Sequence, residues 1–106
     1  MKFAITLSTA EPETAFNALR LGNFARTQGD EVGVFLIGTG VDLEKTADPR
    51  FDVVGQARKL QEAGGKIMAC GTCLKLRESQ GSDVCPLSTM KDLYQLVASA
   101  DRVVSF

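Results

Sequence analysis

Two cysteines separated by two residues, in Cys70-Gly71-Thr72-Cys73, are the side chains of this chain whose type and spacing suit chemistry best. They directly follow the apolar run Lys66-Ile67-Met68-Ala69, which predicts a buried strand, and they precede residues 74–79, whose composition favours a helix. The thiols are therefore expected at a strand-to-helix turn, where outward-pointing N–H groups favour a thiolate. Such a pair is typical of redox or sulfur chemistry, and it is equally half of a zinc site.

Length and composition indicate the number of domains, the kinds of partner and the compartment to expect for this cysteine pair. The chain has 106 residues with 44% hydrophobic content, which predicts a single domain over residues 1–106. Twelve basic residues against thirteen acidic ones, with no dense basic run, argue against nucleic acid or an anionic membrane as partner. Residues 1–7 are too short for a signal-peptide core, and no apolar stretch has the length of a membrane span. We therefore expect a cytoplasmic protein, in which three cysteines do not form a disulfide framework.

Strand and helix patterns alternate along the whole chain without a linker. We expect strands at residues 3–7, 32–37, 66–69 and 102–106. The helices expected between them are one from Pro12 to about Gln28 with Ser8 or Thr9 as its cap, one carrying Val53, Ala57 and Leu60, and one capped by Ser88 that turns Met90, Leu93, Leu96, Val97 and Ala100 inward. Strands separated by helices predict an α/β fold, a three-layer α/β/α sandwich with a mostly parallel sheet of four or five strands.

In such a sheet the ligand site lies at the carboxyl ends of the strands. Cys70 is expected at that edge, together with the turn at residues 8–12 and the polar loop at residues 38–50. The segment Gly38-Thr39-Gly40 in that loop lacks the third glycine, the lysine and the following helix of a phosphate cradle. We interpret it as turn chemistry.

Three segments of the chain resemble the DsrE/DsrF-like family of small proteins, which includes sulfur-relay subunits. The most specific is Lys66 to Leu74, with its strand-ending cysteine. The segment Gly38-Thr39-Gly40-Val41 and the ending from Ser88 to Phe106 support it, and the resemblance covers essentially the whole chain.

The resemblance implies a function for the cysteines. In family members that act in sulfur transfer, a cysteine at the position of Cys70 carries sulfur as a persulfide and exchanges it with donor and acceptor proteins. Such proteins commonly assemble as trimers or hexamers. For this chain we expect no cofactor and no metal. Cys73 matches a variant of the motif that many members carry. Many members also have Arg-Gly a few residues later, whereas here Arg77 is followed by Glu78.

The chemistry of the residues agrees with this reading, and Cys70 and Cys73 are the candidate catalytic residues. A carrier needs a thiolate at neutral pH, and a helix start lowers the thiol pKa. Lys75 and Arg77 would add to this effect if they pointed back to the sulfur, and would otherwise be solvated surface charges. Cys73 would resolve a persulfide on Cys70 into a disulfide and release sulfide, or would protect the site from overoxidation.

Other interpretations of the same residues remain open. A dithiol oxidoreductase would use both thiols, although thioredoxins place the pair after an early strand and behind an aromatic residue. A zinc site would combine Cys70, Cys73 and Cys85, and would need a fourth ligand. Cys70 would otherwise be a buried structural thiol. An interaction protein would use Met90, Leu93 and Tyr94, which helical spacing more simply places in the core.

Overall fold

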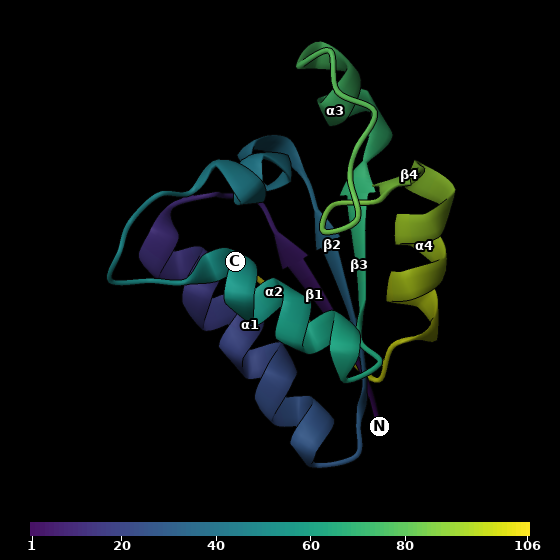
Figure 1. The fold of residues 1–106 in the computed structure, drawn as a ribbon. Helices are drawn as coiled ribbons and strands as arrows, with labels where there is room; N and C mark the ends of the chain where they lie inside the picture. The colour runs from purple at the N-terminus through teal and green to yellow at the C-terminus, as the bar shows by residue number, and fades with distance from the viewer.

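A five-stranded, wholly parallel sheet forms the centre of the computed structural model, which describes residues 1–106 (Figure 1). The strand order is β4-β3-β2-β1-β5. The bounds are β1 Lys2–Leu7, β2 Glu31–Leu36, β3 Lys66–Cys70, β4 Leu87–Ser88 and β5 Arg102–Ser105. The predicted α/β class and the number of strands are confirmed, and β4 is the strand that the sequence pattern did not indicate.

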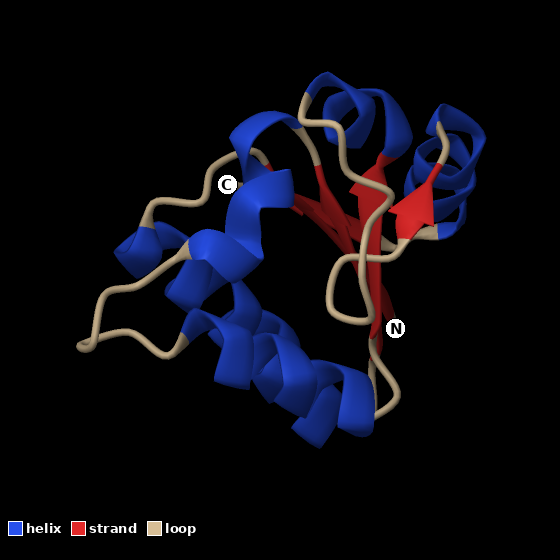
Figure 2. Ribbon diagram, turned by 45° about the horizontal axis from the view of Figure 1, so that its top comes forward, coloured by secondary structure: helices blue, strands red, loops and turns tan.

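Helices cover both faces of this sheet, as the view in Figure 2 shows. The bounds are α1 Pro12–Thr27, α2 Val53–Glu62, α3 Gly71–Leu76 and α4 Met90–Ser99. Helices α1 and α2 pack together on one face, and Gly22 of α1 lies against Ile5 and Val32. Helix α4 covers the other face, where Leu96 lies over Gly33. The short helix α3 continues directly from β3 at the carboxyl edge of the sheet (Figure 1). No helix combines the length and the apolar character that crossing a membrane requires.

Strand β2 lies in the middle of the sheet and is almost entirely buried. Its residues from Val32 to Leu36 are all buried, and Val34 and Phe35 are completely inaccessible. A near-continuous apolar run is what a strand covered on both faces requires.

Two helix caps differ from the sequence-based expectation. Glu11 caps α1, because its carboxylate accepts hydrogen bonds from the N–H groups of Glu13 at 2.7 Å and Thr14 at 3.3 Å. Ser8 instead donates to the carbonyl of Phe106 at 2.8 Å and so joins the end of β1 to the carboxyl terminus.

Thr89, and not Ser88, caps α4. Its hydroxyl accepts the N–H of Asp92 at 3.3 Å, and the Asp92 carboxylate accepts the N–H of Thr89 at 2.8 Å, which is a capping box. Ser88 is not available for this role because it pairs with Cys70 in the sheet.

The loop expected at residues 38–50 begins with a 3-10 helix, η1 Gly38–Lys45. Gly40 lies so close to the end of β1 that a Cβ atom there would overlap the carbonyl oxygen of Leu7. The glycine therefore allows η1 to pack directly on the carboxyl edge of the sheet, beside the start of α3.

Helix α4 is less buried than its spacing predicts. Leu96 is buried, but Met90 is 61% exposed, Val97 is 40% exposed and Tyr94 is 74% exposed. A single ten-residue helix covers this face, so only one row of its side chains reaches the sheet. The expectation that Met90 and Val97 turn inward is wrong, and so is the placement of Tyr94 in the core.

Candidate functional site: a cysteine pair at the sheet edge

Cys70 lies where β3 becomes α3, as the sequence pattern predicts. It is the last residue of the strand and the N-cap of the helix, and only 6% of it is exposed. The next residue, Gly71, passes close to β4, because a Cβ atom there would lie 2.8 Å from the carbonyl oxygen of Ser88. The glycine between strand and helix therefore lets the chain turn tightly beside β4.

The surroundings of the Cys70 sulfur favour its ionised form. Burial is the largest single influence and opposes ionisation. The N–H of Cys73, the thiol of Cys73 and the N–H of Thr72 act in the other direction, and together they lower the pKa of Cys70 below its ordinary value. The side chain accepts no capping hydrogen bond of ordinary geometry, so these donors act as oriented dipoles around the sulfur.

Cys73 is the protonated partner of this pair. It lies one turn into α3 and is half-buried, and its sulfur accepts the N–H of Gly38 at 3.2 Å. Its interaction with the Cys70 sulfur and its burial raise its pKa, and these effects exceed the opposite influence of Gly38 and Arg77. The first proton to leave the pair therefore comes from Cys70, while Cys73 keeps its hydrogen as a donor.

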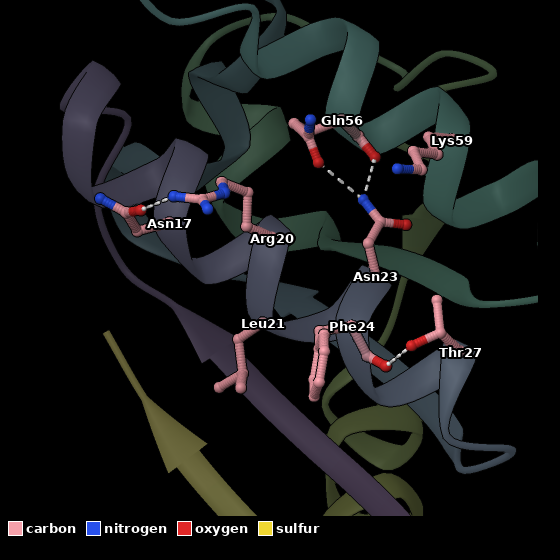
Figure 3. A pocket seen from close by; sticks show the side chains of 8 residues that line it. All are labelled: Asn17, Arg20, Leu21, Asn23, Phe24, Thr27, Gln56 and Lys59. Carbon is pink, nitrogen blue, oxygen red and sulfur yellow. Dashed lines mark hydrogen bonds between the residues drawn. The ribbon is translucent and has the colours of Figure 1, made fainter.

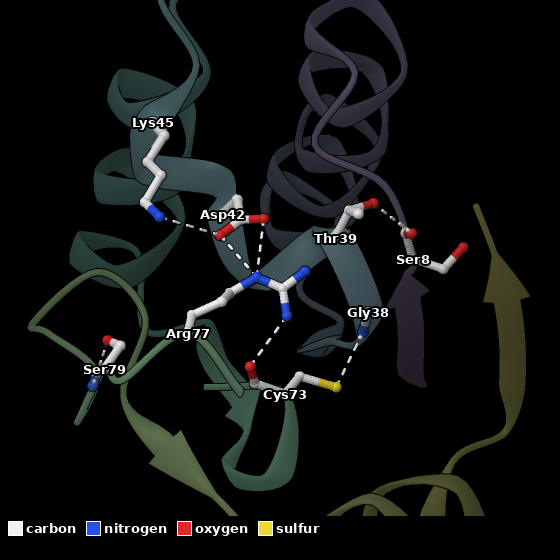
Figure 4. A network of polar contacts seen from close by, with 9 residues as sticks. Ser8, Gly38, Thr39, Asp42, Lys45, Cys73, Arg77 and Ser79 are labelled. Atoms are coloured by element: carbon white, nitrogen blue, oxygen red, sulfur yellow. Dashed lines mark hydrogen bonds and ion pairs between the residues drawn. The ribbon is translucent and has the colours of Figure 1, made fainter. Parts of the chain in front are cut away.

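Arg77 joins this helix to η1 in the network of Figure 4. Its Nε donates to both carboxylate oxygens of Asp42, at 2.9 and 3.0 Å, and its Nη1 donates to the carbonyl of Cys73 at 3.0 Å. Asp42 also pairs with Lys45 at 3.5 Å. Arg77 and Asp42 are about three-quarters buried, with side chains 26% and 24% exposed, so this is not a surface ion pair of the usual weak kind.

Cys85 lies apart from the pair in a different environment. It is 2% exposed, and burial, with Glu44 as a further cause, raises the pKa of its thiol to about 12. Its N–H is held by the hydroxyl of Ser82 at 3.1 Å, and that hydroxyl also donates to Glu44. No three cysteine or carboxylate side chains of the chain lie close enough together to hold a metal ion, so the three cysteines do not form the zinc site considered above within one chain.

Two cavities of the molecule, of about 480 and 530 Å³, are lined by other residues. One of about 480 Å³ lies between α1 and α2 (Figure 3). There the amide of Asn23 donates to the backbone carbonyl of Gln56 at 3.0 Å and to its side-chain oxygen at 2.9 Å, which ties the two helices together. The cavity also contains Arg20 and Lys59, but no thiol. The thiols of Cys70 and Cys73 lie instead at the carboxyl edge of the sheet.

The structure brings together most of the predicted site and adds two groups. The turn after β1 and the loop after β2 meet beside the cysteines, where the Thr39 hydroxyl donates to the carbonyl of Ser8 at 3.1 Å. Sequence reasoning missed the N–H of Gly38 and the carboxylate of Asp42 as partners of the helix that carries Cys73. The only sequence signal was their place in a long loop at the expected edge. Lys75 is exposed, as expected of a solvated surface charge, whereas Arg77 is not.

Comparisons with known proteins agree with this architecture. The sequence model of the DsrE/DsrF-like family matches residues 1–106. An uncharacterised protein of Methanocaldococcus jannaschii is 33% identical over 114 residues, which cover 100% of both chains. An uncharacterised protein of Methanopyrus kandleri is 36% identical over 100 residues, which cover 89% of this chain and 83% of that protein. A solved structure, a conserved protein of unknown function from Bacteroides thetaiotaomicron, matches with a TM-score of 0.78 over 99% of this chain and 94% of that one. At 18% identity this last likeness shows the fold.

Proposed function

The chain belongs to the DsrE/DsrF-like family, which is associated with sulfur relay, and we propose that it is a sulfur carrier that holds sulfur as a persulfide on Cys70. The observation that carries this proposal is the environment of that thiol. Cys70 ends a strand at the ligand-binding edge of the sheet, and three donors around its sulfur lower its pKa. A thiolate is the form that attacks another sulfur.

The transfer needs one reactive thiolate and no net oxidation. The Cys70 thiolate attacks the outer sulfur of a donor persulfide, the S–S bond of the donor breaks, and the donor leaves as a thiolate. Cys70 then carries the outer sulfur as a persulfide. An acceptor thiolate attacks that outer sulfur, the new S–S bond on Cys70 breaks, and Cys70 returns as a thiolate. The amide dipoles that stabilise the Cys70 anion at the start also stabilise it as the leaving group at the end.

Cys73 has a second role in this proposal. Its thiolate would attack the inner sulfur of the Cys70 persulfide, form a Cys70–Cys73 disulfide and expel hydrosulfide, which ends the relay until a reductant restores both thiols. Its raised pKa opposes this side reaction at neutral pH, because it keeps Cys73 protonated. A dithiol oxidoreductase is the second candidate function, and it is favoured by the effect that each thiol has on the pKa of the other.

The proposed partners are a donor and an acceptor protein, and we propose that copies of the chain also assemble with one another, as trimers or hexamers, in the cytoplasm. Exposed apolar side chains support such contacts, with Met90 and Tyr94 on α4 and Leu87 on β4 at 61%, 74% and 46% exposure. Three free cysteines fit a reducing compartment. Light scattering at several concentrations tests the assembly, and a monomer at all of them would contradict it.

Intact-mass analysis after incubation with a persulfide donor tests the carrier function. The wild type should gain mass in steps of one sulfur, about 32 Da for the added atom of the persulfide. Cys70→Ser should gain none, and Cys85→Ser should behave like the wild type, because Cys85 is buried with a raised pKa. Loading that disappears in Cys85→Ser and persists in Cys70→Ser would refute the assignment.

Cys73→Ser separates the two candidate functions. A carrier still accepts sulfur on Cys70 in this variant, and holds it longer, since the neighbouring thiol that expels sulfide is absent. A dithiol oxidoreductase loses turnover and accumulates the mixed disulfide with its substrate. The measurement is the decay of the persulfide mass under mild reducing conditions. Failure of Cys73→Ser to load sulfur, or rapid reduction of a model disulfide by the wild type, would favour the oxidoreductase.

A further inference from the structure

Helix α3 and the 3-10 helix η1 are joined at two points, and both points involve the residue that carries the second thiol. At the first point the N–H of Gly38 donates to the Cys73 sulfur at 3.2 Å. At the second point Asp42 holds Arg77, which in turn donates to the Cys73 carbonyl at 3.0 Å. The two contact points lie four residues apart in each segment, from Gly38 to Asp42 in η1 and from Cys73 in α3 to its C-cap Arg77 (Figure 4).

We propose that Asp42 and Arg77 are positioning residues for the cysteine pair, which fix the turn of α3 that carries the Cys73 thiol and keep this thiol on the N–H of Gly38. The N–H of Gly38 donates to the Cys73 sulfur, and the Cys73 thiol in turn lowers the pKa of Cys70. Successive hydrogen bonds polarise one another. The relevance of this positioning to sulfur transfer rests on the proposed function. The expected effect on the acidity of the thiols does not depend on that function.

The geometry of Arg77 suits a positioning role better than a role as a nearby charge. The Nε of its guanidinium donates to both oxygens of the Asp42 carboxylate and its Nη1 donates to the Cys73 carbonyl, so the planar group fixes the orientation of that turn of α3. Arg77 acts less on the pKa of Cys73 than the Cys70 sulfur, burial and the N–H of Gly38 do. Asp42 faces Arg77, and Lys45 pairs with the same carboxylate.

Replacement of Asp42 distinguishes a positioning effect from a charge effect, because the two predict opposite changes in the acidity of Cys70. Asp42→Asn removes a negative charge and leaves Arg77 positive, so a purely electrostatic effect would make the thiols more acidic. A positioning effect makes Cys70 less acidic, since Arg77 loses its anchor and the Cys73 thiol loses its alignment. Arg77→Lys keeps the positive charge but lacks the planar group whose Nε and Nη1 contact the Asp42 carboxylate and the Cys73 carbonyl at the same time. Positioning therefore predicts that this variant also makes Cys70 less acidic.

The test is the pH dependence of alkylation of Cys70 by iodoacetamide, with fragmentation mass spectrometry to separate Cys70 from Cys73. We expect the pH midpoint to rise by about half a unit in Asp42→Asn and in Arg77→Lys, which is about threefold less thiolate at a pH below the midpoint. The matched control is Asp48→Asn, which breaks another Asp–Arg pair, with Arg50 at 2.7 Å, and should leave the midpoint unchanged. Thermal unfolding of each variant checks that the domain is folded at the assay temperature.

The Cys73→Ala background shows whether the effect passes through Cys73. In that background Asp42→Asn should no longer move the Cys70 midpoint, because the group that transmits the effect is absent. An unchanged or lowered midpoint in the single variants would overturn the proposal, and so would an equal rise in the Cys73→Ala background. Alkylation needs no sulfur donor, so the two proposals can fail separately. If the variants shift the alkylation midpoint as expected but the protein does not load sulfur, only the proposed function is contradicted.

Discussion

Glu78 occupies a backbone position that favours glycine, and its replacement by glycine should stabilise the protein. The residue has a φ of 53°, in the left-handed region, and is the only residue other than glycine there. It directly follows the C-cap Arg77 of α3. The N–H of Glu78 donates to the carbonyl of Lys75 at 3.0 Å, and the N–H of Ser79 donates to the carbonyl of Leu74 at 2.9 Å. These two bonds form a Schellman motif, in which this position is usually glycine.

The size of the effect follows from two opposing terms. The left-handed conformation costs a residue with a Cβ atom about 1–2 kcal/mol, which glycine does not pay. Glycine in turn gains freedom in the unfolded chain, which costs the folded state about 0.5–1 kcal/mol. The side chain of Glu78 is exposed and makes no hydrogen bond or ion pair that the change would remove. We therefore expect Glu78→Gly to raise the free energy of unfolding by about 0.5–1 kcal/mol, the difference of these terms.

Thermal and urea unfolding measure this gain, which corresponds to a rise in Tm of about 2–8 °C for a domain of this size. Glu78→Ala keeps the Cβ atom and should show no such gain, so the pair of variants separates backbone strain from loss of the carboxylate. Lys75→Gly places glycine inside the right-handed turn of the same helix and should lower the stability by about 1 kcal/mol. A fall in Tm for Glu78→Gly, or an equal rise for Glu78→Ala, would refute the argument.

Three further predictions follow from contacts elsewhere in the chain. Gly40→Ala should destabilise the domain by about 2 kcal/mol or more, because a Cβ atom would overlap the carbonyl of Leu7 and push η1 away from the sheet; a Tm like that of the wild type would contradict this contact. Under native conditions at pH 8, Cys85 should react with iodoacetamide at least about tenfold more slowly than Cys70, since burial raises its pKa to about 12 and the thiolate is the reactive form; equal labelling would show that the loop above it opens. The N–H and hydroxyl of Thr89 lower the pKa of Asp92, so the stability contributed by this capping box is present above the ordinary Asp pKa and is lost as the pH falls through the lowered one. Thr89→Ala should therefore reduce Tm at pH 7 and flatten its decline at acid pH, and parallel curves for the two proteins would speak against it.

The sequence pattern was sufficient for the elements whose apolar runs are long and regular. Residues Val32 to Leu36 read as a strand covered on both faces, and β2 is the central strand of the sheet. The two-residue strand β4 was not predictable in the same way, because Leu87 and Ser88 are extended only through their pairing with Ala69 and Cys70. The inward assignment of Met90 and Val97 failed for a related reason. Helical spacing shows which side chains share a face, but the width of the sheet beneath that face is a tertiary property.

Some features of the candidate site could also be predicted from local sequence, whereas others depend on tertiary contacts. The position of Cys70 at a strand-to-helix turn is local, and composition on either side of the motif was enough to predict it. The contacts of the second thiol are tertiary, because the N–H of Gly38 that donates to the Cys73 sulfur lies 35 residues away in the sequence. Arg77 read as a surface charge because its partner Asp42 lies in another segment, and it is close to Cys73 only because Gly40 lets η1 pack on the sheet edge. A Cys-x-x-Cys motif alone therefore indicates that two thiols lie near one another, whereas the contacts of the second thiol depend on the loop after the second strand.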